Sequence, residues 1–360
     1  MKFDKKSALG ILLSALLLWW TLHDESLGDV WRVLRNSNGF LFLVGTVLAT
    51  LIFPLRARRW RTILEPVAGR IPFGPLWRST AIGMMMNNIF PLRAGEFARA
   101  FALSREVPRV AITTSFGSLA VDRIFDAVVL LALMFGAMLD PKFPDDVTVA
   151  GRTMPQIAAG GVLFVVVLLV LCYTVVLQPA RVMALVGAVA RRVLPKHEAT
   201  LVRLVEHGVG GLAVLKDGRR FFAVLLWALA HWLVHALALY TCFVAVGIDV
   251  PFTAALFLQG ILGIGVAVPS SPGFFGVFES FAVIGLGVYG VPKELAISWA
   301  LGYHILSFIP ITVMGAVYFA KLGLSVATLR RAADVEPPAP SSPVATAPNA
   351  PTAPTPPRVR

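Results

Sequence analysis

Charged residues are scarce in this sequence of 360 residues. They make up 14% of the chain, whereas hydrophobic residues make up 57%. An average soluble domain has about 25% charged residues, so this composition excludes an ordinary soluble protein. The sequence predicts an all-α polytopic membrane protein.

Cysteine is also scarce. The two cysteines, Cys172 and Cys242, each lie inside an apolar stretch. Two such residues provide neither a disulfide framework nor the paired thiol ligands of a structural metal site. We expect both to be packing residues, and we expect no metal and no other cofactor.

The sequence lacks the common catalytic motifs. In "HWLVH", His231 and His235 are one helical turn apart, but Trp232 stands where a zinc protease of the His-Glu type has its glutamate. "GILGIG" follows no strand, which excludes a dinucleotide-binding loop, and no Gly-x-Ser-x-Gly elbow occurs. We therefore expect that the protein is not an enzyme.

Positive charge, in contrast, is in excess, with a net charge of +12. The basic residues flank apolar segments and are not interleaved with aromatic residues, which argues against a nucleic-acid partner. Basic residues at the ends of apolar segments instead indicate which side is cytoplasmic. Such clusters precede the first apolar run, follow the second as Arg56, Arg58, Arg59 and Arg61, and fill the segment 178–220.

Six apolar runs approach the length of about 20 residues that a helix needs to cross a bilayer. They cover residues 8–22, 40–55, 111–139, 156–177, 221–247 and 295–320. Together with the basic clusters, six crossings place both termini in the cytoplasm.

Two segments do not fit a simple crossing. The segment 178–220 has apolar and basic residues at helical spacing, which is typical of amphipathic helices on the inner leaflet. Residues 334–360 are rich in Pro and Ala and predict a disordered cytoplasmic tail. The transmembrane domain is therefore expected to cover residues 1–330.

Two further apolar stretches are broken, at about 73–105 and 254–290. Each contains a proline followed four residues later by glycine: Pro91 and Gly95 in the first, Pro269 and Gly273 in the second. This pattern predicts two helical hairpins that enter the membrane and return. Three crossings separate the two halves, so the repeats would be inverted, an arrangement typical of transporters. The alternative is eight full crossings with parallel repeats.

The first hairpin carries charges at membrane depth, where each needs a partner. Arg93, Glu96 and Arg99 share one helical stripe, and Ser118, Asp122 and Asp126 share another on the next run, with Arg123 beside it. Arg93, Arg99 and Arg123 are candidates for binding a phosphate through forked hydrogen bonds. Asn87, Asn88 and Pro91, at the turn of the hairpin, complete this candidate site. The alternative is an ion-pair network that locks the hairpin to the following helix.

The second hairpin is chemically different. Its candidate site residues are Ser270, Ser271, Gly273 and Glu279, after Pro269, with His304 on the following run. These groups suit a cation, an amine or a proton. The alternative is a glycine-rich packing interface.

Three motifs carry a family resemblance: "NNIFPLRAGEFAR", "DRIFD" and "PSSPGFFGVFE". With them, the chain resembles the lysylphosphatidylglycerol synthase transmembrane region family over most of residues 10–325. That family includes the flippase-like module of bacterial multiple peptide resistance factors and many stand-alone proteins. The resemblance implies a multi-pass protein of the bacterial inner membrane that moves lipids between leaflets, without the synthase domain of the two-domain members.

The sequence therefore predicts a lipid translocase with a phosphate-bearing lipid as its partner. Two alternatives stay open, namely a membrane-embedded transferase acting on a lipid-linked substrate and a lipid-binding accessory subunit. A homo-oligomer also stays open, and so does the identity of the lipid.

Overall fold

A computed structural model of the chain describes residues 5–90, 94–144, 148–149, 152–193, 217–267, 270–325 and 327–329. The protein is built almost entirely of helices, and one short antiparallel ladder joins β1 (Thr148–Val149) to β2 (Arg152–Thr153). The helices of the first half are α1 (Lys5–Leu22), α2 (Leu27–Asn36), α3 (Gly39–Ala68), α4 (Phe73–Ile89), α5 (Gly95–Glu106), α6 (Ile112–Ala137), α7 (Met154–Leu177) and α8 (Pro179–Val193). Those of the second half are α10 (Gly218–Val246), α11 (Phe252–Ala267), the 3₁₀ turn η3 (Pro272–Phe274), α12 (Val277–Gly287) and α13 (Lys293–Lys321).

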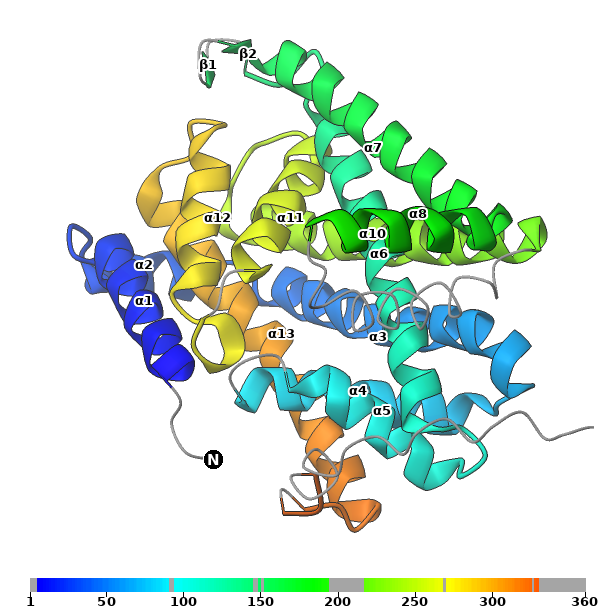
Figure 1. The fold of residues 1–360 in the computed structure, drawn as a ribbon. Coiled ribbons are helices and arrows are strands. Elements are labelled where there is room, and N and C mark those ends of the chain that lie inside the picture. Colours follow the sequence, from blue (N-terminus) through cyan, green and yellow to red (C-terminus); the bar gives the residue numbers. More distant parts are fainter. Residues whose placement is uncertain are drawn as a thin grey trace, which may run out of the picture.

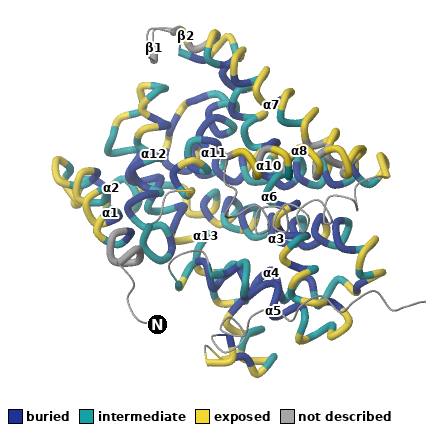
Figure 2. Tube along the Cα trace, in the orientation of Figure 1, coloured by how far each residue is buried: buried dark blue, intermediate teal, exposed yellow. Residues whose placement is uncertain are grey.

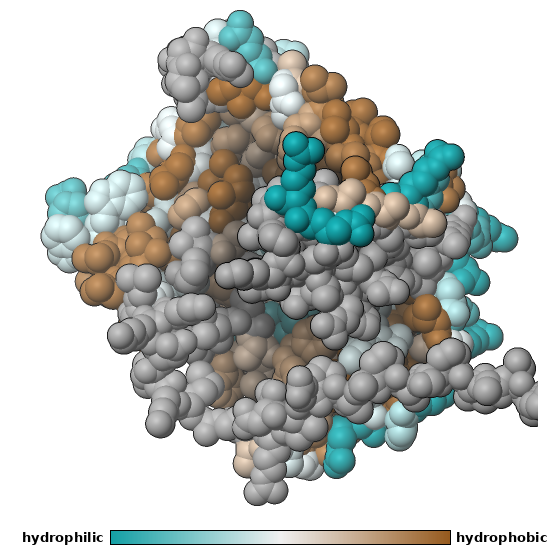
Figure 3. Space-filling view, in the orientation of Figure 1, coloured by the Kyte–Doolittle hydropathy of each residue, from teal (hydrophilic) through white to brown (hydrophobic). Residues whose placement is uncertain are grey.

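Each of the six predicted apolar runs lies on a helix. Three of these helices, α3, α10 and α13, are long and apolar enough to cross a membrane. Apolar side chains on α7 that face away from the protein, such as Leu163 and Phe164, are more than half exposed. Hydrophobic side chains cover α7 and the region of α11 and α12 in Figure 3. This surface suits a hydrocarbon environment, so the chain is a helical membrane protein.

The centre of the fold is the pair α3 and α10. They run side by side across the molecule, and α6 crosses and contacts both (Figure 1). Asn38 caps α3 by accepting hydrogen bonds from two backbone amides of the first turn, and Gly247 ends α10 in a left-handed conformation at φ 80°. Buried residues concentrate along α3 and α4, whereas α7 and α8 are largely exposed (Figure 2).

The first broken segment folds back on itself as α4 and α5. The two helices approach closely at Gly83, where an added Cβ would lie 2.8 Å from both the Cβ of Arg99 and the carbonyl oxygen of Gly95. The expected break at Pro91 falls in residues 91–93, outside the described residues.

The second broken segment forms α11, η3 and α12. Gly273 and Gly276 take φ values of 70° and 85°, which only glycine adopts without strain, and they allow the sharp return of the chain. Pro269 lies outside the described residues. The 3₁₀ turn η3 contacts α4, so the two broken segments meet inside the fold.

The helices of the first half differ from the predicted apolar runs in two places. α3 does not end near residue 55 but continues to Ala68, so Arg56 and Arg59 belong to a helix and not to the following loop. α2 is a further helix outside the six predicted apolar runs, because it is only 10 residues long and amphipathic.

Candidate functional site

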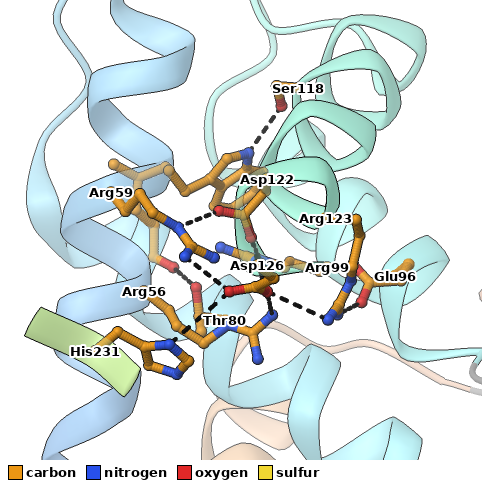
Figure 4. A network of polar contacts seen from close by, with 12 residues as sticks. Arg56, Arg59, Thr80, Glu96, Arg99, Ser118, Asp122, Arg123, Asp126 and His231 are labelled. Carbon is orange, nitrogen blue, oxygen red and sulfur yellow. Dashed lines mark hydrogen bonds and ion pairs between the residues drawn. The ribbon is translucent and has the colours of Figure 1, made fainter. Parts of the chain in front are cut away.

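The two aspartates of α6 form the centre of a buried charge network (Figure 4). Asp122 and Asp126 are one helical turn apart, and both are at most 5% exposed. As the sequence predicts, they share one stripe. They face α3, where Arg59 donates from Nε to Oδ1 of Asp122 at 2.6 Å and from Nη1 to Oδ1 of Asp126 at 2.8 Å. Arg56 donates from Nη2 to Oδ2 of Asp126 at 3.2 Å.

Arg99 reaches this network from α5. Its Nη1 lies 3.5 Å from Oδ2 of Asp122, and its guanidinium lies 4.1 Å from the ring centroid of Trp60. Trp60 in turn donates from Nε1 to the hydroxyl of Ser118 at 2.8 Å, so the aromatic ring is held in place. A guanidinium on the face of a tryptophan is stabilised by the ring quadrupole. Arg99 is thereby positioned without a direct hydrogen bond to a carboxylate among the described residues.

A second ion pair forms the edge of the network. Arg123 of α6 binds Glu96 of α5, and its Nη1 also lies 3.5 Å from Oδ2 of Asp126. The side chains of Arg123 and Glu96 are 41% and 24% exposed, unlike the buried centre. Glu96 therefore pairs with the following helix, and among the described residues no ion pair joins it to Arg99 of its own stripe.

α10 closes the network on another side. Trp232 donates from Nε1 to Oδ1 of Asp126 at 3.1 Å, and Nδ1 of the buried His231 lies 3.9 Å from the same oxygen. His235, one turn further on, is 3.2 Å from Oε1 of Gln259. His231 thus lies beside Asp126, whereas His235 contacts Gln259. Within the described ranges, no group of three His, Cys, Asp or Glu side chains is arranged to hold a metal ion.

Of the two asparagines of the first hairpin, Asn87 joins the two helices of the hairpin and Asn88 joins the hairpin to α13. The backbone amide of Gly95 donates to Oδ1 of Asn87 at 2.9 Å, and Asn88 donates to the hydroxyl of Thr312 on α13 at 2.7 Å. Pro91 and Arg93 of the predicted site lie outside the described residues.

The predicted residues of the second half form a separate cluster around Glu279. Its Oε1 is 2.7 Å from Nδ1 of His304, and its Oε2 accepts from the amide of Gly276 at 2.6 Å. Nε2 of His304 is 2.8 Å from the carbonyl oxygen of Gly273. The amide of Ser271 donates to Ser14 of α1 at 2.8 Å.

Ser270 is half-buried at the start of the same turn, whereas Pro269 is outside the described residues. In the described part of the chain, no hydrogen bond or ion pair joins this cluster to the arginine–aspartate network.

Five described members of the network are absent from the predicted site, namely Arg56, Arg59, Trp60, His231 and Trp232. A sequence signal points to the two arginines. Two carboxylates on one stripe of an apolar helix require cationic partners, and Arg56 and Arg59 share a helical face by their spacing of three residues. Trp60, His231 and Trp232 gave no comparable signal, because aromatic and histidine side chains in apolar helices are usually packing residues.

A model of the lysylphosphatidylglycerol synthase transmembrane region family matches residues 7–315 of this chain. The curated relatives include the glycosyltransferase AglD of Haloferax volcanii, which is 26% identical over 348 residues. That alignment covers 89% of this chain and 55% of AglD, so the chain spans about half the length of that relative.

Other relatives match over nearly their whole length. A UPF0104 membrane protein of Methanothermobacter thermautotrophicus is 23% identical, with 87% of this chain and 93% of the relative covered. The UPF0104 membrane protein PH1989 of Pyrococcus horikoshii is 22% identical, with 87% and 95% covered. These organisms are archaea, so a bacterial inner membrane stays a prediction for this chain.

Proposed function

The chain belongs to the lysylphosphatidylglycerol synthase transmembrane region family, and we propose that it moves a phosphate-bearing lipid between the two leaflets of the cytoplasmic membrane. The observation that carries this proposal is the buried network of Arg56, Arg59, Arg99, Asp122 and Asp126. Charges inside a membrane protein are costly and commonly mark a substrate path.

The position of the network supports transport. It joins α5 of the first broken segment to α3, α6 and α10, so a ligand that changes its ion pairs would also act on the hairpin. Hairpin and network are therefore mechanically coupled.

The helix lengths support re-entrant hairpins. α4, α5, α11 and α12 have 17, 12, 16 and 11 residues, all below the roughly 20 residues that span a bilayer core. Two hairpins that enter from opposite sides and meet at α4 and η3 would place the network between the two faces of the membrane. This is the arrangement from which alternating access proceeds.

A second candidate function is lipid-linked group transfer. The name of the relative AglD, a glycosyltransferase, favours it, although this chain covers only 55% of that protein. An accessory subunit that binds lipid without moving it is a third candidate.

One experiment separates the three functions. Purified protein is reconstituted into vesicles with labelled phosphatidylglycerol, and both the leaflet and the mass of the label are followed. A translocase moves the label between leaflets with its mass unchanged. A transferase given a lipid-linked donor changes the mass, and an accessory subunit changes neither leaflet nor mass.

A further inference from the structure

The buried part of the arginine–aspartate network carries more positive than negative charge. Arg56, Arg59 and Arg99 are at most 7% exposed, and among the described residues they face two buried carboxylates, Asp122 and Asp126. With ordinary ionisation this leaves one positive charge in excess within the described residues. The Arg123–Glu96 pair at the edge adds one charge of each sign and does not change the excess. An uncompensated buried guanidinium costs several kcal/mol, so a bound anion would stabilise this state.

The hydrogen bonds indicate that the excess positive charge lies mainly on Arg99. Arg59 is bound to both aspartates, whereas Nε and Nη2 of Arg99 have no hydrogen-bond partner in the described part of the chain. Nε of Arg56 and Nη2 of Arg59 are also without a partner there. Buried donors that lack an acceptor are rare in native proteins and commonly mark a bound group.

The guanidinium groups of Arg99 and Arg56, each of which has at least one of these unpartnered donors, approach the same carboxylate oxygen. Nη1 of Arg99 and Nη2 of Arg56 lie 3.5 and 3.9 Å from the same atom, Oδ2 of Asp122. That oxygen accepts no hydrogen bond among the described residues, although it lies between two guanidinium groups. Each guanidinium group presents several N–H donors in a fixed fork. Two such groups beside a carboxylate oxygen that accepts no hydrogen bond there are well arranged to bind an anion with several oxygens.

We propose that Arg99 and Arg56 bind the phosphate of a phosphodiester that carries one negative charge. A single negative charge neutralises the buried excess, whereas a phosphomonoester carries about 1.5 to 2 charges near pH 7 and would overcompensate it. An aminoacylated phosphatidylglycerol has a net positive charge and would add to the excess. The partly exposed pair Arg123–Glu96, which adjoins Asp126, is the edge through which the phosphate reaches the site.

The proposal rests on the proposed function only for the source of the phosphodiester, which we take to be a membrane lipid. The test therefore measures binding and not transport. Protein in phosphatidylcholine nanodiscs is titrated with phosphatidylglycerol, phosphatidic acid, lysylphosphatidylglycerol, soluble glycerophosphoglycerol and inorganic phosphate. We expect the tightest binding for phosphatidylglycerol. Tightest binding of phosphatidic acid or of lysylphosphatidylglycerol contradicts the charge argument, and equal binding of the soluble diester or of inorganic phosphate contradicts a lipid source.

Variants make the test specific. Arg99→Gln should weaken binding of phosphatidylglycerol about tenfold or more, because a charge-assisted hydrogen bond is lost. Arg105→Gln, an exposed position in the last turn of the same helix, is the matched control and should bind like the wild type. Arg99→Gln should also keep or raise the melting temperature of the ligand-free protein, since it removes the unpaired charge.

Two results for Arg99→Gln would contradict the proposal. Wild-type affinity in Arg99→Gln overturns the proposal, and so does a large loss of stability, which would show that Arg99 is a structural residue. Arg99→Lys keeps the charge without the fork and should recover part of the affinity if the protein folds as the wild type does. If phosphatidylglycerol binds as expected but does not cross the membrane, the binding site stands and the translocase proposal fails.

Discussion

Arg59 of α3 holds both aspartates of α6, at 2.6 Å from Asp122 and 2.8 Å from Asp126. Among the described residues, Arg99 has a 3.5 Å ion pair with Asp122 and a contact with the face of Trp60, and no hydrogen bond to either aspartate. One cluster thus contains a tightly bound arginine and a loosely bound one, with different expected roles.

The first prediction concerns the bound arginine. Arg59→Gln leaves two buried carboxylates without their main partner and should destabilise the protein by about 3 to 5 kcal/mol. Thermal unfolding in detergent, with folded yield from size-exclusion chromatography, measures this loss. Arg58→Gln on the exposed side of the same helix is the control and should unfold like the wild type. If Arg59→Gln melts at the wild-type temperature, the ion pairs of Arg59 with Asp122 and Asp126 do not stabilise the fold.

The second prediction concerns the close approach of α4 and α5. Gly83→Ala places a methyl group 2.8 Å from the Cβ of Arg99 and from the carbonyl oxygen of Gly95, so the helices must separate. We expect a lower melting temperature and weaker phosphatidylglycerol binding, because Arg99 moves away from Asp122. Gly160→Ala in α7 meets nothing within 4 Å and should be neutral or stabilise by about 0.5 to 1 kcal/mol. Equal effects of the two substitutions would show that this contact does not position Arg99.

The third prediction concerns the second cluster. The carbonyl oxygen of Gly273 can only accept, so Nε2 of His304 carries a proton, and the contact between Nδ1 and Glu279 then requires one further proton between them. If this proton is released as access alternates, a pH gradient should drive lipid movement. Glu279→Gln should keep lipid binding and lose the dependence on the gradient.

Proteoliposomes with an imposed pH difference measure this coupling, and Asp29→Asn, which neutralises a partly exposed carboxylate paired with Arg32 on α2, serves as the control. Glu279 also accepts a hydrogen bond from Gly276, so a purely local role is the competing account. In that case Glu279→Gln lowers stability while the response to the gradient is retained.

The fourth prediction concerns topology. Single cysteines are placed at exposed residues flanking each broken segment, in a background without Cys172 and Cys242. Cysteines at 70 and 105 should react with an impermeant reagent from the cytoplasmic side, and those at 249 and 287 from the outside. Labelling of 70 and 105 from opposite sides would show that α4 and α5 form a full crossing.

Much of this arrangement can be predicted from the sequence, because it depends on local patterns. Apolar run lengths predict the main helices, and the spacing of Asp122 and Asp126 predicts their common face. The contact of Glu279 with His304 joins two residues that sequence reasoning had already grouped.

The choice of partner cannot be predicted in the same way. Arg56 and Arg59 lie in a basic run that is equally typical of a cytoplasmic loop, and Arg59 binds carboxylates 63 and 67 residues further along the chain. Only the packing of α3 against α6 selects these arginines. The same packing places Arg99 over Trp60 with no hydrogen bond to a carboxylate in the described part of the chain, which no periodic pattern indicates.

The most direct test of the central claim is the initial rate at which labelled phosphatidylglycerol crosses vesicles that contain the wild type, Arg99→Gln or Arg105→Gln. We predict a wild-type rate well above that of protein-free vesicles, the same rate for Arg105→Gln, and a rate reduced about tenfold or more for Arg99→Gln. A wild-type rate equal to that of protein-free vesicles, or equal rates for the wild type and Arg99→Gln, would contradict a lipid translocase that carries its substrate on this arginine.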